Sequence, residues 1–107
     1  VNYNGLTDNK YYEISQLQFG KNPEAMFTFN LASKEECYRF MNKLKVVKRA
    51  TNLFDNKTLA IHPSSTIYGN FSEELRKQMN INDKTIRISV GLEDFETLYA
   101  DFVQAIY

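Results

Sequence analysis

The sequence predicts a single α+β domain in which helices cover one face of a small, mostly antiparallel sheet. Short segments of alternating apolar and polar residues, typical of strands, recur between segments whose apolar residues follow helical spacing. Because the strand segments are short, we expect such a sheet with helices on one side. At 107 residues and 43% apolar content, the chain can bury roughly two-thirds of its unfolded surface. We read the element order as helix, strand, helix, strand, helix, strand, helix, with no linker or repeat.

The first part of the chain predicts one helix and one strand. Asp8 or Asn9 can cap a helix whose apolar residues stand at helical spacing, and Gly20 suits the left-handed residue at its end. The apolar residues of this helix are Tyr11, Ile14 and Leu17. Residues 26–31 then alternate and predict a strand.

A capping box opens the second helix. Ser33 can accept a hydrogen bond from the third helical amide while Glu36 reaches back, so we expect a helix that ends near Lys45. Its buried face would hold Cys37, Phe40, Met41 and Leu44. The apolar segment 59–61 predicts a short strand that stops at His62, because the residue before a proline avoids the helical region.

The second half predicts a helix, a strand and a final helix. Residues 70–79 carry acidic residues early and basic residues late, which suits a helix macrodipole. Residues 85–90 alternate, with Ile86, Ile88 and Val90 on one side and Thr85, Arg87 and Ser89 on the other. From about Asp94, a last helix would place Phe95, Leu98, Tyr99, Phe102 and Ile106 on one face.

Composition excludes several classes of function. The 13 basic and 13 acidic residues balance, so the chain lacks the one-sided field that a nucleic-acid or anionic-membrane partner requires. A single cysteine allows no internal disulfide and favours a reducing cytoplasm. A single histidine excludes a multi-histidine metal site. The first residues have neither an initiator methionine nor a signal-peptide core, so we expect the sequence to start in mid-chain.

Arg87 is the first candidate for chemistry, because a guanidinium matches a carboxylate with two parallel hydrogen bonds. The alternative is that Arg87 is an ordinary surface arginine on the solvated face of an edge strand. From the residue type alone, this is the more common case. Asn52 is the second candidate, with a turn-forming asparagine as its equally simple explanation. We expect the Glu93–Asp94 pair to supply negative charge at a helix N-terminus.

Other reactive side chains have simpler explanations. Cys37 lies on a helix face with apolar residues and predicts a buried thiol instead of a nucleophile. Residues 64–66 form a cluster of hydroxyl groups after His62, in which no general base with the right spacing is visible. Neither a glycine-rich phosphate loop nor a nucleophile motif is present in the sequence. The residues by themselves therefore predict an α+β domain with one possible anion clamp.

Three stretches together resemble the C-terminal domain of the pyridoxal-phosphate (PLP)-dependent transsulfuration enzymes of cysteine and methionine metabolism. Residues 1–6 read V-N-Y-N-G-L, similar to the family's V-x-Y-P-G-L. Residues 55–66 read D-N-K-T-L-A-I-H-P-S-S-T, similar to D-x-K-[ST]-L-x-x-H-P-[AS]-S-T. Residues 86–94 read I-R-I-S-V-G-L-E-D, similar to [IV]-R-[LI]-S-[VI]-G-[LI]-E-[DH]. The resemblance covers nearly the whole chain, and it is closest to O-acetylhomoserine sulfhydrylase and cystathionine γ-synthase.

The resemblance implies the small C-terminal domain of a fold-type-I PLP enzyme over residues 1–107, without the large domain that holds the cofactor. Arg87 matches the arginine that binds the substrate α-carboxylate, and Asn52 falls at the position that helps to hold it. The lysine, phosphate ligands and stacking aromatic of the cofactor would lie in the preceding large domain. The resemblance thus implies PLP in the parent enzyme and no catalytic or cofactor-binding residue in this chain. We expect the isolated domain to be inactive, and the parent to be a homotetramer.

Three functions remain open at this point. The chain can belong to an enzyme that replaces the acetate of O-acetylhomoserine with sulfide or a thiol. It can belong to a methionine or cystathionine γ-lyase that eliminates instead. It can also be a free-standing module that binds a small molecule without catalysis. A domain taken from a larger enzyme should expose the apolar face that normally packs on the missing domain.

Overall fold

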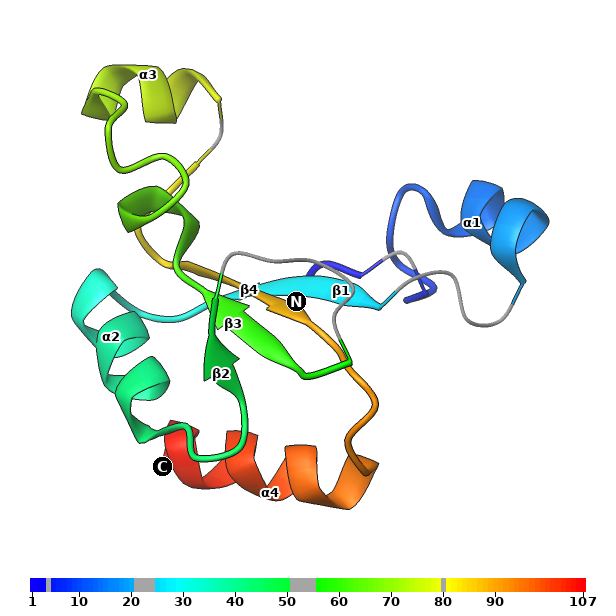
Figure 1. Ribbon diagram of the computed structural model, residues 1–107. Coiled ribbons are helices and arrows are strands. Elements are labelled where there is room, and N and C mark those ends of the chain that lie inside the picture. The colour runs from blue at the N-terminus through cyan, green and yellow to red at the C-terminus, as the bar shows by residue number, and fades with distance from the viewer. Residues whose placement is uncertain (4, 21–24, 51–55, 80) are drawn as a thin grey trace.

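The computed structural model describes residues 1–3, 5–20, 25–50, 56–79 and 81–107, with the backbone only for Phe19. Its helices and strands follow one another as shown in Figure 1. They are α1 (Tyr12–Phe19), β1 (Met26–Asn30), α2 (Lys34–Lys43), β2 (Lys48–Arg49), β3 (Leu59–Ile61), the 3₁₀ turn η1 (Pro63–Ser65), α3 (Glu73–Gln78), β4 (Thr85–Ser89) and α4 (Phe95–Ile106).

The strands form one mostly antiparallel sheet, as the sequence predicts, and their order in it is β1-β4-β3-β2. The β4 strand lies in the interior and is antiparallel to both β1 and β3, whereas β2 is parallel to β3. We had expected three strands, and β2 is the unpredicted fourth. Its two residues are too few to show an alternating pattern, and they form a strand through their pairing with Leu59 and Ala60.

The core lies between the sheet and the two helices α2 and α4, which cover the same face (Figure 1). Ile86 and Ile88 of β4 and Ala60 of β3 are fully buried there. The helices contribute Cys37, Phe40, Met41, Leu98 and Ala105. The shorter helices α1 and α3 project from opposite ends of this body (Figure 1). The prediction of helices on one face of the sheet is therefore confirmed for α2 and α4.

Helix α2 begins as predicted and ends two residues early. The Glu36 amide donates to Ser33 Oγ over 3.2 Å, so the serine half of the capping box forms. Glu36 pairs with Arg39 through its carboxylate, one turn further along the helix, in place of the reciprocal bond. The helix ends at Lys43, and after the capping residue Leu44 the amides of residues 45–47 leave the helical pattern and donate to the Asp101 carboxylate of α4.

The boundaries of α1 and α3 also differ from the prediction. The Tyr11 amide donates to Asn9 Oδ1 over 2.9 Å, so Asn9 makes a turn before α1 and does not cap it. Gly20 ends α1 with φ of 72°, as predicted. Helix α3 is shorter than the predicted range 70–79, because Ser72 Oγ accepts the Leu75 amide and fixes the start of the helix. No helix in the described ranges is long and apolar enough to cross a membrane.

The apolar residues of α4 differ in burial. Leu98 is buried in the core and Phe102 packs partly against it. Phe95, Tyr99 and Ile106 are exposed, with 74%, 60% and 46% of their surface accessible. Apolar residues at helical spacing predict the helix but do not say which surface each of them contacts.

Candidate carboxylate-binding site

Arg87 stands in the middle of the interior strand β4, with a neighbouring strand on each side. Its partners in register are Thr28 on β1 and Ile61 on β3. It alternates with Ile86 and Ile88, which point into the helix-covered core, so its side chain leaves the sheet on the opposite face. The side chain is half-buried, and its Nε atom is inaccessible to solvent. The alternative of an edge-strand arginine on a fully solvated face does not describe this position.

The hydrogen bonding of the neighbouring strand brings Thr28 close to Arg87. The Asn2 amide donates to the Thr28 carbonyl over 2.8 Å, and the Thr28 amide donates to the Asn2 carbonyl over 3.2 Å. Both backbone groups of Thr28 therefore point away from β4. In an antiparallel ladder, this makes Thr28 and Arg87 a non-hydrogen-bonded pair, the kind whose side chains approach more closely. Arg87 is thus held between a hydroxyl on one side and the buried Ile61 on the other.

Thr58 and Glu93 join the two long sequence motifs to each other. The amide and the hydroxyl of Thr58 both donate to the Glu93 carboxylate, over 2.7 and 2.6 Å. The same hydroxyl accepts the Gly91 amide over 2.9 Å. Burial alone would raise the pKa of Glu93, but the two hydrogen bonds from Thr58, together with a backbone hydrogen bond and the charge of Lys57, outweigh it and lower the pKa. We had expected Glu93 to act on the helix N-terminus. Its carboxylate instead fastens the end of β4 to the start of β3.

Gly91 is required where the chain turns from β4 toward α4. A Cβ atom at this position would lie 2.5 Å from the Asn56 carbonyl oxygen, a contact too close for any side chain. The Leu92 amide donates to the same oxygen over 2.9 Å. The glycine therefore allows two backbones to lie against each other, four residues after Arg87.

His62 and the serines after it hold the other end of the β3–β4 pair. The imidazole is buried, with Nε2 2.6 Å from the Asp83 carbonyl oxygen and Nδ1 2.7 Å from Ser65 Oγ. A carbonyl can only accept, so Nε2 carries a proton and donates it to Asp83. Ser64 Oγ donates to the Asp83 carboxylate over 2.7 Å, and this bond is the main cause of that residue's lowered pKa. The hydroxyl cluster thus orders the loop that leads into β4.

Cys37 behaves as the sequence predicts. It is fully buried, and its thiol donates to the Lys84 carbonyl oxygen, with Sγ 3.2 Å from that oxygen. Burial raises the pKa of this thiol, so it stays protonated at neutral pH and is a poor nucleophile. Within the described part of the chain, no group of three histidine, cysteine or acidic residues could hold a metal ion.

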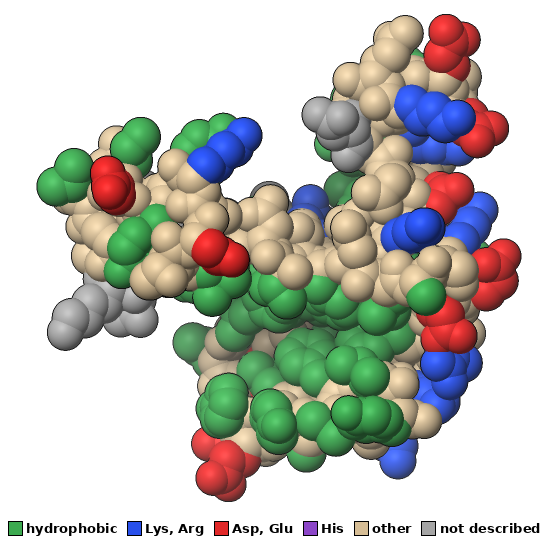
Figure 2. Space-filling model, turned by 180° about the vertical axis from the view of Figure 1, so that it is seen from behind, with side chains coloured by type: hydrophobic (Ala, Val, Ile, Leu, Met, Phe, Trp, Pro, Cys, Tyr) green, Lys and Arg blue, Asp and Glu red, His purple; other side chains and the backbone are tan. Residues whose placement is uncertain are grey.

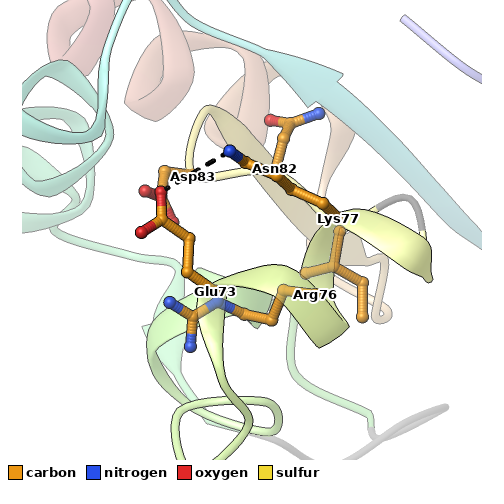
Figure 3. Close-up of a pocket in the computed structure, with 6 residues that line it drawn as sticks. Glu73, Arg76, Lys77, Asn82 and Asp83 are labelled. Atoms are coloured by element: carbon orange, nitrogen blue, oxygen red, sulfur yellow. Dashed lines mark ion pairs between the residues drawn. The ribbon is translucent and has the colours of Figure 1, made fainter.

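A cavity of about 390 Å³ lies beside α3, away from Arg87 in the sequence (Figure 3). Lys77 lines it and lies 3.9 Å from the Glu73 carboxylate. Arg76 also lines it, but its Nη1 donates to the carbonyl oxygens of Tyr68 and Phe71, over 3.3 and 2.6 Å. Both cations already face oxygen acceptors of the protein, so this cavity is a weaker candidate for a carboxylate than the face that carries Arg87. The second predicted residue, Asn52, lies outside the described residues.

A model of the Cys/Met metabolism PLP-dependent enzymes matches residues 1–107, the full length of the sequence. The chain belongs to this family. The family is PLP-dependent, and a matching structure from Campylobacter jejuni, described as an O-acetylhomoserine (thiol)-lyase, contains a pyridoxyl-lysine phosphate. That structure superposes on 97% of the chain with a TM-score of 0.88 and 37% identity, and 25% of its own length is covered. The recognition made from the sequence motifs is confirmed at the level of the family.

Other members of the family carry different reaction names at nearly the same identity. O-acetyl-L-homoserine sulfhydrylase 1 of Thermus thermophilus is 37% identical over 99% of the chain and 25% of its own length. L-methionine gamma-lyase of Pseudomonas putida is 36% identical over 99% of the chain and 27% of its own length. A structure of O-acetylhomoserine sulfhydrylase from Wolinella succinogenes has a TM-score of 0.83 and 37% identity, with 99% of the chain and 27% of that structure covered. The chain thus spans about a quarter of the length of these relatives.

The described residues do not fit the cofactor of this PLP-dependent family. Every described lysine except the half-buried Lys43 is exposed. The described glycines are isolated in the sequence, so in the described part of the chain no glycine-rich loop stands ready to hold a phosphate beside a lysine. PLP enzymes hold their cofactor as a Schiff base on a lysine and bind its phosphate beside it. The candidate ligand-binding group among the described residues is instead Arg87, which lies on the interior strand β4.

Proposed function

We propose that this chain is the carboxyl-terminal domain of a PLP-dependent transsulfuration enzyme, in which Arg87 binds the α-carboxylate of the amino-acid substrate. The observation that carries the proposal is the place of Arg87 on the interior strand, between Thr28 and Ile61, on the face that α2 and α4 leave open. A clamp on an interior strand is positioned more firmly than one on a loop, and the Thr58–Glu93 bonds fix the end of that strand. Asn52 is the proposed second ligand of the same carboxylate, from its position in the resembling motif.

The cofactor would be held by the parts of the parent enzyme that lie outside this chain. When bound there, PLP supplies the electron sink for the reaction, while this domain orients the amino acid by its carboxylate. The chain by itself is then expected to be inactive. By the same resemblance, we propose a cytoplasmic, homotetrameric parent.

The proposed reaction is replacement of the γ-acetoxy group of O-acetylhomoserine by sulfide or a thiol. The motif over residues 55–66 favours it, and relatives named as O-acetylhomoserine sulfhydrylases match nearly the whole chain. Methionine γ-lyases match almost as well, so γ-elimination is the second candidate. Product analysis separates the two, because replacement incorporates sulfide whereas elimination releases ammonia and a 2-oxoacid.

Substitution of Arg87 in the full-length enzyme tests the carboxylate role. We expect Arg87→Ala to weaken amino-acid binding by about 2–5 kcal/mol, because it removes one partner of a buried charge pair. Arg87→Lys should also be damaging, since a point charge cannot reproduce the two-pronged contact. Substrate titration and steady-state kinetics measure the change in affinity and turnover. Asn52→Ala should weaken amino-acid binding in the same way but to a smaller extent.

The matched control is Arg39→Ala, because Arg39 is exposed on α2 and pairs only with a neighbouring carboxylate. It should leave substrate affinity unchanged. Unchanged affinity and turnover in Arg87→Ala would refute the clamp. The free-standing module is tested separately by the native gene product. A visible absorption band that borohydride removes indicates a cofactor enzyme, whereas a colourless product of about this length favours the module.

A further inference from the structure

Thr28 lies beside Arg87 on the neighbouring strand, with its side chain on the same face of the sheet. The two residues are directly opposite each other in the antiparallel pair of β1 and β4. The Cβ atoms of such partners are about 4.5–5.5 Å apart, and they are closer in a non-hydrogen-bonded pair than in a hydrogen-bonded one. Thr28 is therefore the β1 residue whose side chain starts nearest to that of Arg87.

The open face of the sheet is suited to a polar ligand. It is the face opposite α2 and α4 (Figure 1). Figure 2 shows hydrophobic side chains gathered over the helix-covered body, and mainly backbone and uncharged polar side chains between the projecting helices α1 and α3. A carboxylate that approaches Arg87 from the open side therefore meets a surface rich in hydrogen-bonding groups.

The backbone of Thr28 is held from both sides. Strand β1 pairs with β4 on one side, and on the other side the amide and the carbonyl of Asn2 bond to the carbonyl and the amide of Thr28. A β-branched side chain on a fixed strand has few rotamers. The hydroxyl therefore has a defined place beside Arg87 before any ligand arrives, which reduces the entropy cost of binding.

The Thr28 hydroxyl is available to a ligand. Thr85 lies on the same face, two positions before Arg87, and its hydroxyl donates to Asn30 Oδ1 over 2.7 Å. Thr28 is half-buried, and within the described part of the chain its hydroxyl makes no hydrogen bond. A carboxylate offers about four acceptor positions, and an arginine fork uses two of them. One of the others can accept a hydrogen bond from a hydroxyl on the adjacent strand.

We propose that Thr28 is a further substrate-binding residue, whose hydroxyl donates a hydrogen bond to the carboxylate that Arg87 holds. This rests on the proposed function, because it requires the α-carboxylate of the substrate at Arg87. The guanidinium fork alone lets the carboxylate hinge about the line of its two hydrogen bonds. A third hydrogen bond from β1 stops that rotation, so the two strands together set the direction in which the rest of the amino acid points.

Thr28→Val in the full-length enzyme tests the proposal. Valine keeps the branched shape and the strand preference of threonine and removes the hydroxyl. The affinity for O-acetylhomoserine, measured by substrate titration, should fall about 10-fold, as expected for the loss of a hydrogen bond to a charged group. Thr28→Ser supplies the hydroxyl again and should regain most of that affinity.

A double-mutant cycle with Arg87→Ala, measured as kcat/KM, shows whether the two residues act on the same group. Once Arg87 is removed, the carboxylate is no longer held beside β1. Adding Thr28→Val should then lower kcat/KM by less than about twofold, in place of the 10-fold loss in the natural background. Non-additivity of this size is not expected for a residue that only supports the strand.

Thr85→Val is the matched control. It also removes a threonine hydroxyl from the open face, but that hydroxyl bonds to Asn30 within the protein. This variant should lower the Tm and leave the affinity for O-acetylhomoserine unchanged. Thr28→Val should show the opposite pattern, with an unchanged Tm and a lowered affinity.

Three results would overturn the proposal. Unchanged affinity in Thr28→Val, beside a weakened Arg87→Ala enzyme, would keep the clamp and remove Thr28 from it. A lowered Tm together with an affinity that Thr28→Ser does not regain would make Thr28 a structural residue of β1. Unchanged affinity in Arg87→Ala would refute the proposed function, and the role of Thr28 would fail with it.

Discussion

Asp101 and Glu93 are two carboxylates that accept hydrogen bonds from distant loops, yet they hold different parts of the domain. Asp101 lies on α4 and accepts three successive amides of residues 45–47, over 2.8, 2.8 and 2.9 Å. Gln104 donates to it as well. Burial alone would raise the pKa of Asp101, but these bonds more than offset it and lower the pKa. The three amide bonds join α4 to the loop that follows α2.

Glu93 holds the strand that carries the candidate site. Its carboxylate binds Thr58, and the Thr58 hydroxyl binds the Gly91 amide, so the network ends four residues from Arg87. Asp101 fastens the helix layer behind the sheet, whereas Glu93 fastens the sheet strand from which the guanidinium projects. These two hydrogen-bonded carboxylates can therefore be separated by experiment into one that supports stability and one that supports substrate affinity.

The largest effect is expected for Asp101→Ala. The change leaves three backbone amides without their acceptor, which should lower the local stability by about 3–4 kcal/mol. Hydrogen exchange of the β4 and α2 amides in the full-length protein measures it. The protein that remains folded should keep its affinity for the amino-acid substrate, because no contact of Asp101 reaches the face that carries Arg87.

Glu96→Gln is the control for this variant. Glu96 is exposed in the first turn of the same helix, and its substitution should change stability by no more than about 0.5 kcal/mol. If Asp101→Ala instead raised the KM as strongly as it lowered stability, the separation between the two carboxylates would be wrong.

A smaller effect, of a different kind, is expected for Glu93→Gln. The amide keeps the shape of the side chain but loses its charge and one acceptor, so stability should fall by about 1–2 kcal/mol. Because the end of β4 loosens, amino-acid affinity should fall about 3- to 10-fold, equivalent to about 0.6–1.4 kcal/mol. Steady-state KM and substrate titration in the full-length enzyme measure this.

Thr58→Ser tests the same network more gently. It keeps both the amide and the hydroxyl that bind Glu93, so affinity should stay close to that of the natural protein. A Glu93→Gln enzyme with lowered stability and unchanged affinity would show that Glu93 acts only as Asp101 does.

The sequence predicted those parts of the fold that have a repeating pattern. The strand carrying Arg87 alternates over five residues, and α2 has a serine cap, so both were found near their true limits. Strand β2 has two residues and therefore no pattern to detect. Periodicity placed the apolar residues of α4, such as Phe95, on one helix face, but it does not tell which of them pack on the sheet and which are exposed.

The sequence predicted where Arg87 lies on its strand but missed the contacts that fix the end of that strand. Alternation placed Arg87 on the side of β4 away from the core, and the register confirms that placement. The contact between Thr58 and Glu93 was missed, since these residues are 35 positions apart and a hydrogen bond between distant residues leaves no periodic signal. Both nonetheless belong to the motifs that carry the family resemblance. Thr58 and Glu93 each stand at a polar position of one of the two motifs. Those two polar positions are the signal from which a contact between the motifs could have been predicted.

The last expected effect is a pH dependence of stability that the two carboxylates share. Both pKa values are lowered in the folded state, so each carboxylate stabilises the fold fully above its unfolded pKa, near 4. That contribution is lost as the pH falls toward the folded pKa, where the carboxylate takes up a proton. Between pH 5 and pH 3, stability should therefore fall by at most about 1.4 kcal/mol per pH unit for each group. Asp101→Asn and Glu93→Gln each remove one titrating carboxylate, so each should make the fall of stability with pH less steep. Hydrogen exchange across this pH range measures the slope. Equal slopes in the natural protein and both variants would mean that other groups, such as Asp83, control the acid response.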